Sequence, residues 1–336
     1  MKRFVARVSL WAAALVVLLG WFTLWPGITW AQSNYVLRIA AAPPKGDIRY
    51  EAVYYLQKEV PKATGGRVKV EVFEGTLGSE REILERLTLE TLEGYLGSTG
   101  PLQALTGEPL ASLYDVPYLF KDWGHLYRVA KSDVGRKLNE KMMAKGIRIL
   151  DYVSMGTRAV YTRTKPIKAA ADLQKLKIRV MENPVYIAMY KEFGAIPVPM
   201  AWGEIYTSLQ TGVLDAVDGS LSSGLASKHT ESVKYVTFLA NHVVIASILA
   251  VSERWWNGLP ADIRGQIARV AAEAAAYEQK KNEEYQDQLK REWQKAGVQF
   301  TEPDRKEMEM IARRVYPAVE KGIGKEIFQR VIEMSK

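Results

Sequence analysis

Two arginines stand at the ends of neighbouring predicted strands in the middle of the chain. Arg158 opens a segment rich in β-branched and aromatic residues (157–162), and Arg179 lies in a short apolar run (177–180). Pro184 ends this second segment and fits the first turn of a following helix. Because ligands of α/β sheets bind in the crevice outside the strand ends, both arginines are expected to reach such a crevice.

An arginine in that position is suited to binding a carboxylate. Its guanidinium stays charged and presents a planar fork that donates two parallel hydrogen bonds. An ion pair inside a closing cleft is shielded from water, so it contributes more than a pair on the surface. An arginine at a strand end is by itself more often a surface charge, and this alternative stays open on the residues alone.

The sequence carries no motif typical of catalysis. It has no glycine-rich phosphate loop, no His-Glu metalloprotease spacing and no Gly-x-Ser-x-Gly elbow. Cysteine is absent, which removes thiol nucleophiles, disulfides and zinc-thiolate sites. His125, His229 and His242 lack metal-ligand spacing and are expected to be surface or core residues. The protein is therefore not expected to be an enzyme.

Three carboxylates near the arginines are the remaining candidates for acid–base chemistry: Glu204, Asp215 and Asp218. No histidine is close to them in the sequence, so solvated or structural roles are expected. Asp218 has a second interpretation, in which it accepts a hydrogen bond from a hydroxyl or amine of the ligand.

Polar and aromatic residues elsewhere are further ligand-binding candidates. A predicted strand ends in Ser98 and Thr99, whose hydroxyls and backbone N–H groups could meet a ligand, although an ordinary turn explains them equally well. Trp202, Tyr118 and Tyr206 could supply aromatic faces to a pocket, and the two tyrosines could add hydroxyl donors. Plain packing is the alternative for all three.

Length and composition are those of a soluble protein with two domains. The chain has 336 residues, of which 48% are hydrophobic and 25% charged, as in ordinary globular proteins. Removal of the three basic residues of the signal described below lowers the formal net charge from +8 to +5. No basic run with interleaved aromatics accompanies this mild excess, so a small anionic ligand is favoured over nucleic acid.

The N-terminus has the pattern of a secretory signal. Lys2, Arg3 and Arg7 precede an uncharged apolar run (8–25), and small residues end at Ala31. Cleavage is predicted after Ala31. The alternative is an uncleaved anchor, because the apolar run reaches the length of a membrane span. With either outcome, the rest of the chain is expected outside the cytoplasm.

Element order predicts an α/β protein. The mature chain opens with a β-α-β-α pattern, and helices are expected at 123–143 and 305–334. An apolar strand at 242–251 is expected to return to the first sheet. A helix at 261–295 would be roughly 50 Å long at 1.5 Å per residue, which suits an element that spans both domains. Two helices with a break between them are the alternative.

Several motifs are similar to those of a known family. GTR at 156–158 is followed by LKIRV at 176–180 and by PVPMAWGEIYTSLQTGVLDAVDG at 197–219. LRIAAAPPKGD, GSEREILERL, YDVPYLF and LPADIRGQI extend the similarity over essentially the whole mature chain. The sequence thus resembles the solute-receptor subunit of TRAP transporters, the DctP family.

The resemblance implies an α/β two-domain periplasmic binding protein of the type II, Venus flytrap kind. After a signal peptide (1–31), the first domain is predicted to take 33–156 and 243–284. The second is predicted to take 157–242 and 285–336. The two interdomain strands and the long helix would form the hinge between them.

The resemblance also implies roles for particular residues. Arg179 takes the place of the arginine that clamps the ligand carboxylate, and Arg158 that of a second arginine used by several members. Trp202 would wall the pocket or offer a backbone carbonyl to a cation that bridges the ligand. Otherwise no cofactor is expected. Relatives often carry an asparagine in the loop after the VDG-type aspartate; that place falls at Gly219, so an amide contact is expected to be missing. Tyr118 belongs to a segment that lines the cleft in the family.

The function implied is that of a periplasmic receptor. It would bind a small organic carboxylate and deliver it to the small and large membrane subunits of a TRAP transporter, with no nucleic-acid partner. Three alternatives are a receptor for a sensor or an ATP-driven transporter, an enzyme on a similar scaffold, and a structural or adhesive protein. The sequence does not select one acid, and dicarboxylates, 2-oxo and hydroxy acids, sugar acids and aromatic acids are all candidates.

Overall fold

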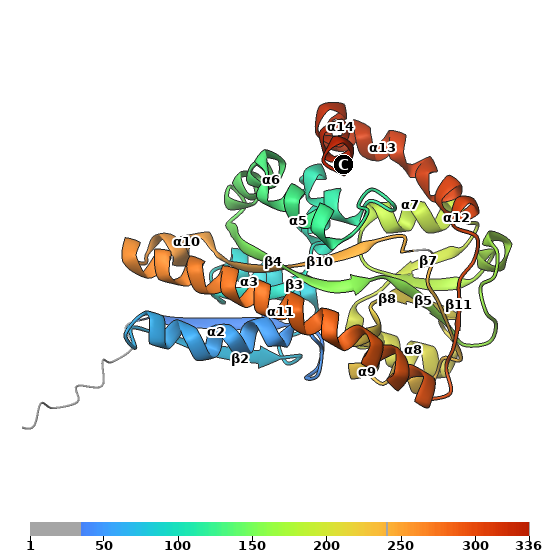
Figure 1. Ribbon diagram of the computed structural model, residues 1–336, viewed down its shortest axis with the longest axis horizontal. Coiled ribbons are helices and arrows are strands. Elements are labelled where there is room, and N and C mark those ends of the chain that lie inside the picture. Colours follow the sequence, from blue (N-terminus) through green and yellow to red (C-terminus); the bar gives the residue numbers. More distant parts are fainter. Residues whose placement is uncertain (1–34, 240, 336) are drawn as a thin grey trace, which may run out of the picture. The chain divides into compact units, whose positions relative to one another are not determined.

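The chain builds two β-sheets, each with helices packed on its faces (Figure 1). The computed structural model describes residues 35–239 and 241–335. The predicted signal peptide (1–31) lies outside these residues, and its cleavage stays a prediction. Within the described ranges, no helix combines the length and apolar character that a membrane crossing requires.

Five strands form the first sheet, in the order β2 (Val68–Glu74), β1 (Tyr35–Ala41), β3 (Gly94–Ser98), β10 (Val244–Ser252) and β4 (Ile147–Thr157). The three N-terminal strands are parallel, and β10 is antiparallel to β3 and β4. Side chains alternate between two buried cores, with Leu37 and Ile39 in one and Ala40 in the other. The predicted return of the 242–251 strand to this sheet is confirmed.

Six shorter strands form the second sheet, in the order β11 (Gln299–Thr301), β9 (Tyr235–Thr237), β5 (Ala159–Thr162), β8 (Ala216–Gly219), β6 (Lys177–Val180) and β7 (Ile196–Pro199). Strand β6 is parallel to both of its neighbours, β8 and the edge strand β7, so β6 and β8 end at the same edge of the sheet. Arg158 lies where the chain passes from β4 of the first sheet to β5 of the second. We call each sheet with its helices a lobe.

The helices of the first lobe begin with α2 (Tyr50–Ala63), α3 (Glu80–Thr88), α4 (Pro101–Thr106), the 3-10 helix η2 (Pro109–Asp115), α5 (Trp123–Lys131), α6 (Asp133–Met143) and α10 (Glu253–Asn257). The single helix predicted at 123–143 is therefore wrong. Ser132 separates α5 from α6 with an extended backbone, and its hydroxyl accepts a hydrogen bond from the Val134 N–H.

The second lobe carries α7 (Pro184–Glu192), α8 (Ile205–Thr211), α9 (Leu221–Ala226) and α12 (Arg305–Ala312). The long helix α11 (Ala261–Lys295) has the predicted bounds and passes both lobes (Figure 1). Ile263 and Ile267 near its start lie in a core of the first sheet, whereas Leu289 and Trp293 near its end lie in a core of the second. The prediction that this helix spans both domains is confirmed.

The C-terminal segment differs from its prediction in where it packs. The tail expected to be helical at 305–334 is helical and consists of α12, α13 (Tyr316–Ile323) and α14 (Lys325–Glu333), with Gly324 at a positive φ of 97° between the last two. Phe328 and Val331 of α14 are buried in a core of the first lobe, not the second. The reason is tertiary packing that a sequence pattern cannot reveal: α13 packs on η2, and in α14 the carbonyl of Val331 lies 2.9 Å from His125 Nε2 of α5. The other domain boundaries stay a prediction.

Candidate ligand-binding site

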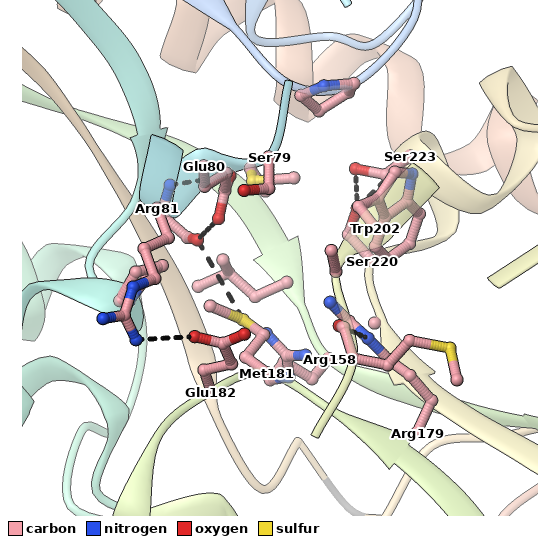
Figure 2. Close-up of a pocket in the computed structure, with 18 of the residues that line it drawn as sticks. Ser79, Glu80, Arg81, Arg158, Arg179, Met181, Glu182, Trp202, Ser220 and Ser223 are labelled. Carbon is pink, nitrogen blue, oxygen red and sulfur yellow. Dashed lines mark hydrogen bonds and ion pairs between the residues drawn. The ribbon is translucent and has the colours of Figure 1, made fainter. Parts of the chain in front are cut away.

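A pocket lies between the two lobes, where strand ends of both sheets meet (Figure 2). The space free of protein atoms, counted together with the open mouth, is about 640 Å³. The first lobe contributes Pro43, Arg49, Ser79, Glu80, Arg81, Ser98, Pro101, Met155 and Ile245. The second contributes Arg179, Met181, Glu182, Met200, Ala201, Trp202, Gly219, Ser220 and Ser223, and Arg158 lies at the crossover.

Arg179 is a buried cation without a counter-ion. Its side chain extends from β6, its Nε donates to the carbonyl of Met200 at 2.9 Å, and its Nη1 donates to the carbonyl of Asp218 at 3.3 Å. The indole of Trp202 lies 5.1 Å from the guanidinium carbon. Among residues 35–239 and 241–335, no carboxylate forms an ion pair with Arg179 and Nη2 has no acceptor. Burial, together with the nearby charge of Arg158, lowers the pKa of Arg179 to about 10.

Arg158 lies beside Arg179 and, unlike it, forms an ion pair with a carboxylate. Its Nε pairs with a carboxylate oxygen of Asp218, and its Nη2 donates to the Asp218 carbonyl at 2.9 Å. Its guanidinium carbon lies 4.6 Å from the centre of the Tyr186 ring. Although burial acts to lower the pKa of Arg158, the Asp218 carboxylate raises it above the ordinary value. The positive charge left uncompensated in the pocket is therefore that of Arg179.

The carboxylate of Asp218 connects Arg158 to other buried side chains behind the pocket wall. Its carboxylate accepts from Arg158 Nε and the Tyr190 hydroxyl and lies 3.0 Å from His242 Nε2. It is fully buried and does not line the cavity, so its oxygens serve the protein and not a ligand. Burial acts to raise the pKa of Asp218, but Arg158 and His242 together hold it well below the ordinary value.

Gly219 and Trp202 shape the wall next to Arg179. A side chain at Gly219 would collide with the Tyr161 hydroxyl and approach the Trp202 ring to 3.0 Å, so only glycine fits. Trp202 is held by a 2.8 Å hydrogen bond from its Nε1 to Ser227 Oγ and by the ring of His229, 5.0 Å away. Both residues line the pocket, as the sequence predicts.

The structure brings together some of the other candidates and not the rest. Ser98 lines the pocket, whereas the hydroxyl of Thr99 donates to Asp115 at 3.2 Å outside it. Tyr118 donates to the carbonyl of Leu239 at 2.6 Å and is part of a second-lobe core. Tyr206 is half-exposed and donates to Glu231 at 2.6 Å on the surface. Thr99, Tyr118 and Tyr206 are therefore removed from the candidate set.

Arg49 and Glu80 are lining residues that the sequence did not single out. Arg49 follows the loop after β1, is 3% exposed, and donates to both Asp47 and Glu80 at 3.0 Å. Glu80 opens α3 directly after its N-cap, Ser79. A usable signal was present, since each follows a predicted strand end, where charged groups reach the crevice.

Within the described residues, the features are two α/β lobes and, in the pocket between them, a buried cation without a carboxylate partner. This is the architecture expected of a receptor for small anions. A profile of the bacterial extracellular solute-binding proteins, family 7 (DctP), matches residues 39–322. The chain therefore belongs to this family, the solute-binding subunits of TRAP transporters.

Individual relatives agree over most of the chain. A solute-binding protein of Verminephrobacter eiseniae is 34% identical over 69% of this chain and 68% of its own. The C4-dicarboxylate-binding periplasmic protein DctP of Rhodobacter capsulatus is 30% identical over 87% of each. The crystal structure of a TRAP periplasmic solute-binding protein from Polaromonas sp. bound to D-erythronate covers 89% of this chain and 98% of its own, with 30% identity and a TM-score of 0.84. The family and fold expected from the motifs are confirmed.

Proposed function

We propose that the protein is the extracytoplasmic receptor of a TRAP transporter and binds a small organic carboxylate between its lobes. The observation that carries this proposal is the buried Arg179, which lacks a carboxylate partner in the described part of the chain. A buried charge is costly unless it is paired, and an organic acid in the pocket would supply the partner. The relatives agree in ligand class, since one is named for C4-dicarboxylates and another holds D-erythronate.

The loaded receptor would deliver its acid to the small and large membrane subunits of the transporter, with uptake driven by a sodium gradient. Reconstitution with those subunits in liposomes tests this step. Uptake that requires the receptor and stops when the sodium gradient is collapsed is the expected result. Uptake that requires ATP instead would favour the alternative of a receptor for an ATP-driven transporter. We further propose that the signal peptide is cleaved, that the mature protein lies in the periplasm, and that it binds its acid without a cofactor.

Acid binding is tested by a thermal-shift screen of the mature protein against a library of carboxylates. The best acid should stabilise the wild type and leave Arg179→Ala unaffected. The matched control is Arg314→Ala, because Arg314 is exposed and pairs with Glu192 at 3.7 Å on the surface, away from the pocket. Equal stabilisation of all three proteins would refute the clamp. Recovery of the acid unchanged by mass spectrometry supports a receptor, and its conversion would favour the enzyme alternative.

Binding would close the lobes around the acid, with the passage from β4 to β5 at Arg158 and the long helix α11 as connections that bend. Direct contacts already join the lobes around the pocket. On one side, the Ile48 N–H donates to Ser222 Oγ at 2.9 Å, and on the other, Arg81 pairs with Glu182 at 3.2 Å. Deeper in, Asp115 of the first lobe accepts from Tyr186 at 2.9 Å and Asn183 at 3.0 Å of the second.

Tyr186→Phe is expected to lower acid affinity by about tenfold. The variant keeps the ring beneath Arg158 but removes one hydrogen bond to the buried Asp115, which weakens the closed state by about 1.4 kcal/mol. Titration calorimetry measures the affinity, and small-angle scattering should show a larger radius for the ligand-free variant. Tyr127→Phe is the control, because its hydroxyl bonds Asp151 at 3.2 Å within the first lobe. An affinity equal to that of the control would contradict closure through this contact.

A further inference from the structure

We infer that the pocket selects an acid with a single carboxylate and several hydroxyl groups, and discriminates against a second carboxylate. This inference rests on the proposed function and concerns which acid is bound. Its basis is a carboxylate of the protein itself, Glu80, which lines the same pocket as Arg179. Figure 2 shows Glu80 and Ser79 across the pocket from Arg179, so the cavity has a cationic end and an acidic end.

Glu80 is fixed in place by donors from two other segments. Its Oε1 accepts from Arg49 Nη1 at 3.0 Å and from the Ser98 N–H at 3.1 Å, and its Oε2 accepts from the Ser98 hydroxyl. Its side chain is 15% exposed. A carboxylate oxygen can accept two hydrogen bonds, and within the described ranges the protein supplies one to Oε2. Oε2 is thus available to accept from a donor group on the ligand.

The arginines at this end do not offer a second anion site. Arg49 is enclosed by Asp47 and Glu80, and Arg81 pairs with Glu85 at 3.0 Å and with Glu182 at 3.2 Å. In the described part of the chain, Arg179 is by contrast the lining arginine without a carboxylate partner. One ligand carboxylate therefore satisfies the pocket, and a second would face the like charges of Glu80 and Glu182.

Hydroxyl groups fit the acidic end better than an ammonium group does. The guanidinium of Arg49 pairs with both Asp47 and Glu80, so an ammonium group placed beside Glu80 would lie close to this cation and be repelled by it. Ligand hydroxyls both donate and accept, so they can donate to Glu80 Oε2 and to pocket serines. The hydroxyls of Ser79, Ser98 and Ser220 line the pocket and donate their own protons to Glu82, Glu80 and Ser223, so towards a ligand they act as acceptors. Methionine side chains and the Trp202 ring line the space between the two ends and would cover the C–H faces of a polyhydroxy chain.

The inference is tested by titration calorimetry with acids of equal chain length. The four-carbon set is butyrate, D-erythronate and succinate, and the six-carbon set is hexanoate, D-gluconate and adipate. In at least one set, the wild type should bind the hydroxy monocarboxylate at least tenfold more tightly than both companions. Glu80→Gln should reduce that affinity by about tenfold and should narrow or reverse the preference over the dicarboxylate, because it removes the repelling charge.

Glu90→Gln is the matched control, since Glu90 pairs with Arg254 on the surface and does not line the pocket. It should leave all affinities at the wild-type values. A wild type that binds succinate or adipate most tightly would overturn the inference and leave the proposed function standing. A Glu80→Gln variant that weakens every acid equally would also overturn it. If no acid of either set or of the wider carboxylate library binds the wild type, the proposed function itself fails. The wild-type comparison decides the question even where Glu80→Gln does not fold.

Discussion

Arg179→Met is expected to weaken acid binding strongly and, at the same time, to raise the melting temperature of the ligand-free protein. Burial and the charge of Arg158 lower the pKa of Arg179 to about 10 from 12.5, which means that the folded state disfavours this cation. Methionine has a similar length and no charge, so it removes that cost. Loss of the clamp should weaken acid binding by about 2–5 kcal/mol, or roughly 30- to several-thousand-fold.

Arg158→Met is the informative comparison, because the two arginines are neighbours with opposite ion-pair status. Removal of the Arg158 guanidinium leaves the Asp218 carboxylate buried without its main cation, so the melting temperature of this variant should fall. Scanning calorimetry of both variants without ligand, followed by titration with the best acid, measures the two effects. Equal losses of stability in the two variants would contradict the view that Arg158 has a counter-ion in the folded protein and Arg179 does not.

Asp218→Asn is expected to cost about 3–5 kcal/mol of folding free energy, the usual effect of breaking a buried ion pair. The variant leaves Arg158 and Arg179 close together in the interior without the carboxylate between them. It also weakens the contacts to Tyr190 and His242. Urea unfolding measures the loss, and a change below 1 kcal/mol would show that Asp218 does not organise the site.

The stability due to Asp218 should also depend on pH in a defined direction. Its pKa in the folded protein lies below the ordinary value of 3.8, so its contribution is complete above about pH 4 and is lost as the pH falls further. The gap in melting temperature between wild type and Asp218→Asn should therefore be constant from pH 7 to pH 5 and shrink towards pH 3. Burial raises the pKa of Asp115 to about 6, but Asp115 titrates in both proteins, so the difference isolates Asp218. A gap that widens in acid would contradict the assignment.

Sequence patterns predicted those parts of the fold that depend on neighbouring residues. The apolar run that became β6 and the stripe of the long helix α11 are local signals, and both elements formed with the expected bounds. The placement of Arg158 and Arg179 followed from the same reasoning, since a strand end fixes where the next side chain points. Gly219 was placed at the pocket wall, but the reason for a glycine, its contact with Tyr161 and Trp202, became visible only in the folded chain.

Arg49 and Glu80 each follow a predicted strand end, but the contacts between them could not be predicted, because three segments far apart in the sequence form the acidic end of the pocket. Arg49, Glu80 and Ser98 meet only when the ends of β1 and β3 and the start of α3 come together. Tyr118 was assigned to the pocket on its neighbourhood, but its backbone has a positive φ of 56° and its ring lies in a core of the second lobe. For the acidic end and for Tyr118, the path of the backbone between elements determined whether the side chain lines the pocket, and the residue type did not.

The central claim is that Arg179 binds the carboxylate of the ligand, and a crystal structure of the protein with its best acid tests it most directly. The predicted result is a carboxylate within hydrogen-bonding distance of the Arg179 guanidinium, with the remainder of the acid extending towards Glu80. An acid whose carboxylate lies elsewhere, with Arg179 still bonded only to the carbonyls of Met200 and Asp218, would contradict the account.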